Sequence, residues 1–434
     1  MKRQKIANFL TYFCLFLLPW QTVWIYNSLT LNSSTGLETF GWEYGKMTHY
    51  AVQLLIVIAV LLRWELKTNE AAKKIIRSVW WFFGAMVFVS FLSVNPYLSG
   101  AFLFHLLSAL LLFWLLLDER ISTKKIIWFF VLGLIIPCLL GWWQVLLGSS
   151  PASTLFGLAE HLASTPGTSV VEMAGDRLMR AYGAFAHPNI FGGYLVMAIL
   201  MMLGRMAGSG RGAPRPYGQL KYAAIARTII LILLSSTLVI TFSRSAWLAL
   251  FVGIISFFIV SAICKIKIPR KFLLGFTIAF VAVVAFVALF HSAIFTRVTA
   301  SDRLETKSLI ERQSEYQMIG EVIKINPFVG VGSGAYTVAL AEKFSDHNVW
   351  FYQPMHNSFL LFFAETGLLG LVFLIYFLWA VFVQCKHKGE RPLAPTAIVA
   401  TLATLALFDH YLWSQWAGLA LAAVVLAIFV RRLE

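Results

Sequence analysis

Four basic side chains stand where a hydrophobic chain turns polar: Arg180, Arg244, Arg312 and His356. A guanidinium carries a fixed fork of donors that suits phosphate oxygens. An imidazole is the side chain best able to accept a proton near neutral pH. The chemistry that these residue types indicate is therefore anion binding together with proton transfer.

Arg244 lies in the stretch Thr-Phe-Ser-Arg-Ser-Ala-Trp, between two hydrophobic runs that leave almost no loop to carry it into water. Placing a guanidinium at membrane depth is costly, so such a residue is usually paired, reaches the interface or lines a polar cavity. Two interpretations stay open, an interfacial anchor beside Trp247 and an anion site.

Arg180 opens a polar, glycine-containing stretch that ends at Pro188, which suits the first turn of the next helix. Arg180 is either an interfacial anchor or an anion ligand. His187 and Asn189 are either capping and packing residues or contacts to a ligand. Arg177, three residues upstream of Arg180, is a further candidate contact to the substrate.

Residues 303–325 carry apolar residues at helical spacing, which predicts an amphipathic helix along the membrane surface or over a cavity. Its polar face holds Glu311, Arg312 and Glu315. Arg312 and Glu315 are three residues apart and can form an ordinary salt bridge on the helix face, or they can belong to a site. A glycine-rich turn over residues 326–336 follows, where backbone can approach a ligand closely.

His356 and Asn357 lie at the junction between this polar segment and the next hydrophobic run, and Glu365 follows about two turns into that run. A histidine that caps the helix is the structural interpretation, and a general base is the functional one. Glu365 has apolar neighbours and needs a partner or a proton, so it belongs either to the polar site or to the wall of a cavity.

The elements that must position these residues are membrane helices. The 434 residues are 59% hydrophobic and 13% charged, which is too apolar for a water-soluble fold. We expect a single polytopic, all-α membrane domain over residues 1–434, with a large external loop over 293–356. About twelve spans are expected, at residues 7–25, 48–63, 76–93, 100–117, 125–147, 188–204, 228–242, 245–263, 272–292, 357–383, 394–409 and 413–430.

Basic residues set the expected orientation, because Lys and Arg gather in every second loop and before the first span. These loops and both termini are predicted to be cytoplasmic, which puts all four basic candidates on the opposite, external face. The same loops explain most of the net charge of +15, so nucleic acid is not an expected partner.

Several function classes are disfavoured by what the sequence lacks. It contains no GxxxxGK[ST] nucleotide loop and no CxxC or His/Cys cluster typical of a metal site. The four cysteines fall within spans or at their expected cytoplasmic ends, so no external disulfide is predicted. The first hydrophobic segment is not followed by a cleavage pattern and is expected to stay as a helix.

Together these motifs resemble the O-antigen ligase and O-antigen polymerase superfamily of bacterial cell envelopes. The resemblance runs from about residue 177 to 370 and rests on the order and spacing of four motifs: residues 180–189, the stretch 242–247, Arg312 with the Asn-Pro-Phe-Val-Gly-Val-Gly stretch 326–332, and His-Asn-Ser at 356–358 with 365–370.

The resemblance implies a GT-C-like fold and inverting, metal-independent transfer of a glycan from an undecaprenyl-diphosphate-type donor to an acceptor hydroxyl, with no cofactor or nucleotide. It assigns catalytic roles to Arg180, Arg244, Arg312 and His356. Candidate substrate contacts are Arg177, His187, Asn189, Glu315, Asn357 and Glu365. The expected location is the bacterial inner membrane, with the active site facing the periplasm and membrane lipids around the protein.

A ligase that uses lipid A-core or a similar acceptor is the leading interpretation. A polymerase that uses the same donor is the nearest alternative, and a protein O-oligosaccharyltransferase is a third. A transporter of lipid-linked glycans belongs to another class and would require charged residues near the midplane and repeat symmetry, whereas the ionisable residues here gather at one face.

Overall fold

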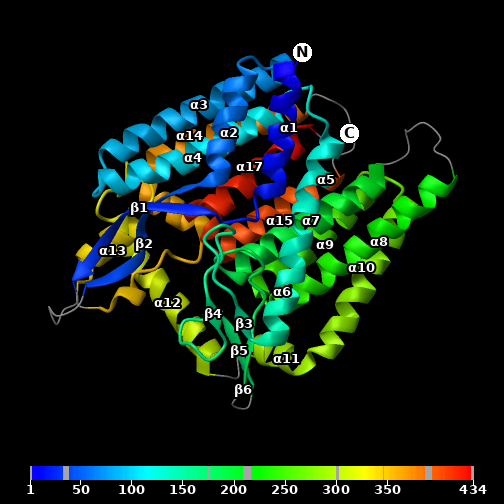
Figure 1. Ribbon diagram of the computed structural model, residues 1–434. Coiled ribbons are helices and arrows are strands. Elements are labelled where there is room, and N and C mark those ends of the chain that lie inside the picture. The colour runs from blue at the N-terminus through cyan, green and yellow to red at the C-terminus, as the bar shows by residue number, and fades with distance from the viewer. Residues whose placement is uncertain are drawn as a thin grey trace.

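The computed structural model describes residues 2–32, 39–173, 176–208, 217–299, 303–345, 347–386 and 393–431. Most of these residues lie in helices (Figure 1). The helices are α1 Lys2–Leu17, α2 Ala51–Arg63, α3 Glu70–Phe91, α4 Pro96–Leu116, α5 Thr123–Gly133, α6 Ile135–Leu147, α7 Pro188–Gly208, α8 Tyr217–Ile240, α9 Arg244–Ile263, α10 Arg270–Leu289, α11 His291–Thr299, α12 Arg303–Ile323, α13 Tyr336–Lys343, α14 Ser358–Lys386, α15 Leu393–Phe408, α16 Tyr411–Ser414 and α17 Trp416–Arg431, with a short 3-10 turn at Val349–Phe351.

Eight described helical segments are long and apolar enough to cross a membrane, judged by length and composition. They are Glu70–Phe91, Pro96–Leu116, Thr123–Leu147, Pro188–Met206, Tyr222–Ile240, Arg244–Ile263, Arg270–Leu289 and Ser358–Gln384. Three shorter apolar helices accompany them, at Ala51–Arg63, Thr396–Phe408 and Trp416–Arg431. The chain is therefore a mostly helical membrane protein, while twelve spans and a GT-C-like fold remain predictions.

Local chemistry explains several helix boundaries. The Asn69 side chain accepts from Ala72 N at 2.9 Å at the start of α3, and Asn95 accepts from Leu98 N at 3.0 Å before Pro96 opens α4. Helix α1 ends at Leu17, well before the limit of the predicted first span. The predicted span 125–147 is two helices, α5 and α6, which meet at Leu134.

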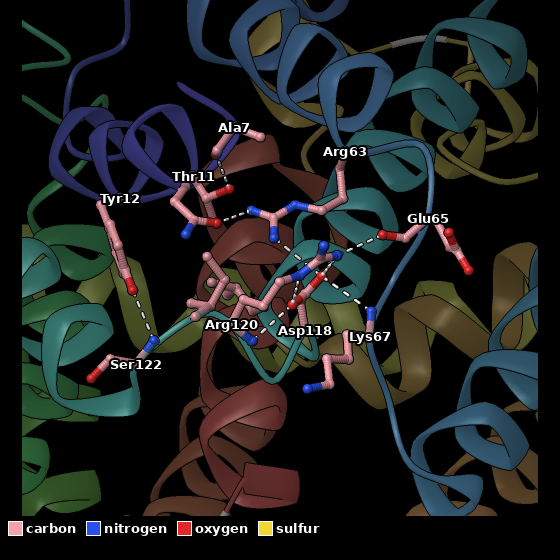
Figure 2. Close-up of polar contacts among 12 residues, drawn as sticks. Ala7, Thr11, Tyr12, Arg63, Glu65, Lys67, Asp118, Arg120 and Ser122 are labelled. Atoms are coloured by element: carbon pink, nitrogen blue, oxygen red, sulfur yellow. Dashed lines mark hydrogen bonds and ion pairs between the residues drawn. The ribbon is translucent and has the colours of Figure 1, made fainter. Parts of the chain in front are cut away.

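A buried ion cluster joins α1, α2, the α4–α5 connection and α17 at one end of the bundle (Figure 2). Arg63 Nη1 lies 3.1 Å from Asp118 Oδ2 with both side chains fully buried, and Arg120 Nη2 lies 2.6 Å from the same oxygen. Tyr12 Oη accepts from Ser122 N at 2.8 Å, and Arg431 donates to Asp118 O at 2.8 Å. These contacts join Tyr12 of α1 and Arg431 at the end of α17 to the same α4–α5 connection.

The mostly helical structure agrees with the predicted all-α class, and it also contains short two-stranded sheets that were not predicted. An antiparallel hairpin pairs β1 Val23–Asn32 with β2 Thr39–Tyr50. Two further two-stranded pieces are β3 Ser149–Ser150 with β4 His161–Leu162, and β5 Val170–Met173 with β6 Asp176–Met179. In Figure 1, β3 to β6, α11 and α12 lie at the lower side, away from both ends of the chain.

The expected amphipathic helix of the large external segment is present as α12. Ile319 and Val322 are buried, whereas Leu309 and Ile310 are exposed. Helix α12 packs against α13 and α14. Two more helices of this segment, α11 and α13, were not predicted.

Candidate active site

A carboxylate and an imidazole form the centre of the site. Glu315 on α12 accepts from His356 N at 2.9 Å, and His356 Nδ1 lies 2.8 Å from Glu315 Oε1 and 3.1 Å from Oε2. Glu315 is 8% exposed. Burial disfavours a charged imidazole, but the hydrogen bond to Glu315 and its negative charge outweigh burial and raise the pKa of His356. When Nδ1–H donates to Glu315, Nε2 is the acceptor, which gives an oriented base.

A second histidine stands next to this pair. The ring of His410 meets the ring of His356 edge to face, with centroids 5.3 Å apart. His410 and Asp409 form the polar turn between α15 and α16, and Asp409 O accepts from Ser358 N at 3.1 Å and from Ser358 Oγ at 2.7 Å. This turn is thereby fixed against the beginning of α14, directly after His356.

His410 and Asp409 are both buried, and their surroundings decide which of the two side chains is charged at neutral pH. Burial lowers the pKa of His410 to about 4, so this imidazole is neutral at neutral pH. For Asp409, burial favours the protonated acid, but the nearby imidazoles, His410 first, outweigh it and lower the pKa of the carboxyl. Asp409 is therefore a buried carboxylate close to the base.

Hydrogen bonds connect Asp409 to the segment that precedes α7. Asp409 Oδ2 accepts from Asn189 Nδ2 at 2.7 Å, and Asn189 Oδ1 accepts from Arg180 Nη2 at 2.7 Å. His187 Nδ1 accepts from Asn189 N at 3.1 Å, and burial lowers the pKa of His187 to about 3. Three of the residues predicted from the sequence, Arg180, His187 and Asn189, thus reach the His356 centre through Asp409.

Arg180 also reaches the turn before α9, where Arg244 lies. Arg180 Nε donates to Thr241 O at 2.8 Å, and Arg297 donates from Nε and Nη2 to Phe242 O at 3.1 and 3.0 Å. Ser243 caps α9 by accepting from Ala246 N, and Arg244 is the first helical residue. Three guanidinium groups therefore gather around one short turn.

Arg312 faces the same centre from α12. Its positive charge opposes protonation of both His356 and His410, which places it within electrostatic range of both imidazoles. Within the described residues, Arg312 Nε is buried without a hydrogen-bond partner, and Arg312 forms no salt bridge with Glu315. The partner of Glu315 is His356, which lies far away in the sequence.

Glu365 holds the glycine-rich loop. Its carboxylate accepts from Gly334 N at 2.7 Å, Tyr336 N at 3.2 Å and Trp413 Nε1 at 2.7 Å. Helix α14 is interrupted at Gly367, with φ 60° and ψ −161°, and the loop fills the gap. The contacts of Glu365 in the described structure are those of a residue that supports the wall of the site.

Asn357 and Arg177, the two remaining predicted substrate contacts, lie in different parts of the structure. Asn357 Oδ1 accepts from Phe359 N at 3.0 Å and Leu360 N at 3.1 Å, so this residue caps α14 beside the base. Arg177 lies on β6, donates to Ser164 O at 2.9 Å and stands 3.9 Å from Glu172. These contacts hold Arg177 to the β5–β6 hairpin and the preceding loop, and they do not extend to His356.

Asp409, His410 and Arg297 are the residues that sequence reasoning missed. Asp409 and His410 form a two-residue polar interruption between the last two hydrophobic runs, and the expected topology puts it on the same face as Arg244. The sequence therefore contained a signal that could have identified Asp409 and His410. Arg297 had no distinctive sequence context, and only the fold brings it to Phe242.

Among the described residues, no group of three or more His, Cys, Asp or Glu side chains is arranged to hold a metal ion.

An apolar cavity of about 320 Å³ lies beside the Arg244 turn, between α7, α8, α9, α10 and α11. Trp247 and Leu250 on α9 line it, together with Ile294 and Val298 on α11. Arg244 and Arg297 belong to the same two helices. The cavity therefore adjoins the guanidinium cluster.

Comparison with known proteins supports one family. Residues 229–375 match the family model described as O-antigen ligase. The matched segment contains Arg244, Arg312, Glu315, His356 and Glu365, and the resemblance to the O-antigen ligase and polymerase superfamily is thereby confirmed. Arg180, Asn189 and Asp409 lie outside it. No curated protein matches the chain.

Proposed function

Starting from the O-antigen ligase match of residues 229–375, we propose that this membrane glycosyltransferase moves a glycan from an undecaprenyl-diphosphate-type donor to an acceptor hydroxyl, such as one on lipid A-core. The observation that carries the proposal is the Glu315–His356 pair, because a carboxylate-oriented imidazole within a network that extends to guanidinium groups suits general base catalysis.

In the proposed reaction, the acceptor oxygen forms a bond to the anomeric carbon while the bond from that carbon to the diphosphate oxygen breaks. The acceptor proton moves to His356 Nε2, and Glu315 stabilises the resulting imidazolium through Nδ1–H. A positioned base of this kind contributes about 10² to 10⁴ in rate. Attack from the side opposite the leaving group inverts the configuration.

The departing diphosphate gains negative charge as the glycosidic bond breaks. Guanidinium groups fixed in a water-poor site stabilise that charge more strongly than they stabilise the ground state. We assign this role to Arg244 and Arg312, since the charge of Arg312 acts on both imidazoles and its Nε is buried without a hydrogen-bond partner within the described residues. The apolar cavity beside Arg244 would hold part of the isoprenoid chain of the donor.

The proposed location is the bacterial inner membrane, with both termini cytoplasmic and the His356 site on the periplasmic face. The clustering of basic residues in alternate loops supports this orientation. So does the separation of the α1–α17 end from β3 to β6 and α12 in Figure 1.

The test uses the purified full-length protein in liposomes with an undecaprenyl-diphosphate-linked oligosaccharide and lipid A-core. Release of undecaprenyl diphosphate together with glycosylated lipid A-core is expected. His356→Ala should reduce this transfer at least 10²-fold, whereas His291→Ala, an exposed histidine on α11, should retain it.

Other outcomes would replace the proposal. Lengthening of the donor-linked chain without lipid A-core product would indicate a polymerase. Movement of the intact donor across the bilayer without bond formation would indicate a transporter. Near wild-type transfer by folded His356→Ala would refute the assignment of the base.

A further inference from the structure

The turn between α8 and α9 has partners that come from two distant segments. The last carbonyls of a helix lack intrahelical donors. Here Ala181 N donates to Ile240 O at 3.0 Å, Arg180 Nε donates to Thr241 O at 2.8 Å, and Arg297 donates twice to Phe242 O. Each of three successive carbonyls is therefore held by a group that lies outside both helices.

The backbone of this turn is strained at Phe242. Its φ is +48°, in the left-handed region that bulky side chains rarely adopt, and its ring is fully buried. The ring packs against Trp247 and Phe290, with centroids 6.5 and 6.1 Å away. Strained residues persist only where the surroundings over-determine them, and they gather at functional sites. The two-pronged bond from Arg297 supplies such a constraint.

Arg297 holds the following residues as well. Its main-chain oxygen accepts from Arg244 Nη1 at 3.3 Å, so Arg297 fixes Phe242 with its side chain and Arg244 with its backbone. Arg297 is 8% exposed and lies on α11, whose Ile294 and Val298 line the apolar cavity. Helix α11 thus connects the cavity wall to the guanidinium of Arg244.

We propose that Arg297 is a positioning residue that, together with Arg180, clamps the turn 241–243 and thereby fixes the guanidinium of Arg244. This inference rests on the proposed role of Arg244 in binding the donor diphosphate. Arg180, which the resemblance makes catalytic, acts in this scheme through Thr241 O and Asn189. The fork of a guanidinium is essential to the clamp, because the single nitrogen of an ammonium cannot replace the two nitrogens, Nε and Nη2, that converge on Phe242 O.

A double-mutant cycle tests the clamp in the liposome transfer assay. Arg297→Lys keeps the charge and loses the fork, and it should lower kcat/KM for the donor about tenfold. Arg244→Lys should lower it about 100-fold. In the double variant, the loss should stay near that of Arg244→Lys alone, because Arg297 acts through Arg244. The KM for lipid A-core should not change in Arg297→Lys.

Additive losses, about 1000-fold in the double variant, would overturn the proposal, as would wild-type kinetics in Arg297→Lys. Absence of transfer by the wild-type protein would instead refute the proposed function. Arg303→Gln is the control, since Arg303 is an exposed arginine that lies 3.4 Å from Glu172. If Arg297→Lys does not fold, Arg180→Lys tests the same turn from its other side, with the same non-additive result expected.

Discussion

At the scale of single residues, the pairing of Glu315 with His356 has the largest chemical consequence. A histidine that is buried without a carboxylate partner loses basicity, as His187 and His410 show with pKa values lowered to about 3 and about 4. His356 is also buried, yet its pKa is raised because of Glu315. The Glu315 carboxylate is therefore the main reason why the proposed base has a raised pKa while His187 and His410 have lowered pKa values.

Glu315→Gln should shift the pH dependence of transfer. The proposed base works when it is neutral, so the rate falls as the pH drops through the pKa of His356. Burial lowers the pKa of His356 and Glu315 is the main group that raises it, so the removal of Glu315 lowers the pKa although the charge of Asp409 remains. The acid limb of the kcat profile should move to lower pH, and the plateau should fall about 10- to 100-fold.

Glu321→Gln is the matched control for this measurement, because Glu321 lies on the same helix, is partly exposed and pairs with Lys324 at 2.6 Å. Its profile should coincide with that of the wild type. An unchanged acid limb in Glu315→Gln would contradict the assignment of His356 as the titrating base.

Residue types alone predicted several residues of this candidate site. Arg244, Arg312 and His356 were conspicuous because charge next to long apolar runs is costly. The partner of Glu315 was not predictable, because the helical spacing offered Arg312 at three residues while the fold supplies His356 at forty-one. Local periodicity carries no information on such long-range contacts.

At the scale of elements, the interruption of α14 explains how the glycine-rich loop is held. Gly332 N donates to Glu365 O at 2.9 Å, and Leu369 N donates to Phe328 O at 2.9 Å, so loop and helix exchange the bonds that a continuous helix would make internally. A Cβ on Gly367 would lie 2.5 Å from Phe328 C. Glycine is required there for its φ and for this close approach.

Gly367→Ala should therefore destabilise the protein by about 2 to 5 kcal/mol, from backbone strain and overpacking together. The measurement is the apparent Tm of the purified protein in detergent. Gly100→Ala is the control, since Gly100 lies within α4 and has no atom within 4 Å of an added Cβ. That substitution should raise the Tm or leave it unchanged. Equal Tm values for the two variants would contradict the role given to the interruption.

The long helices were predictable because lipid demands long apolar runs, and most of their limits agree with the structure within a few residues. The β1–β2 hairpin was not predicted. Its strands, of 10 and 12 residues, are rich in aromatic residues and threonine, but most of their residues were assigned to an external loop. Figure 1 shows this hairpin at the edge of the bundle, where β2 packs against α4.

At the scale of the whole molecule, the cluster in Figure 2 ties the first and last helices together. Asp118 is fully buried between Arg63 and Arg120, and Arg431 donates to the main chain of the same connection. Burial favours the protonated acid, but Arg120 and Arg63 outweigh it and lower the pKa of Asp118. The stabilisation is thus present at neutral pH and is lost as the pH falls through the lowered pKa.

Asp118→Asn should cost about 3 to 5 kcal/mol, because it leaves Arg63 buried without its counter-ion. The apparent Tm in detergent provides the measurement. Glu70→Gln removes one partner of an exposed pair with Lys73 and should leave the Tm almost unchanged, because solvent screens that pair. Similar Tm losses for the two variants would contradict the expectation that the buried ion pair contributes more to stability than the exposed one.

The proposed orientation is tested by labelling intact cells with a membrane-impermeant maleimide. In a background that lacks the native cysteines, Lys324→Cys should be labelled from outside. Lys67→Cys should react only after the membrane is permeabilised. Both positions are exposed, so access depends on the side of the membrane. The reverse pattern would invert the topology and contradict a periplasmic site.

The shortness of two helices has a consequence for where the chemistry takes place. Helices α15 and α17 have 16 residues each. At about 1.5 Å per residue they extend about 24 Å, less than the roughly 30 Å of hydrocarbon in a bilayer. In the predicted topology both helices start from the cytoplasmic face, and the turn between them, with Asp409 and His410, would then lie below the opposite lipid headgroups. A reaction at that depth favours partners that arrive sideways with their own lipid anchors, and it keeps the activated donor away from hydrolysis by bulk water.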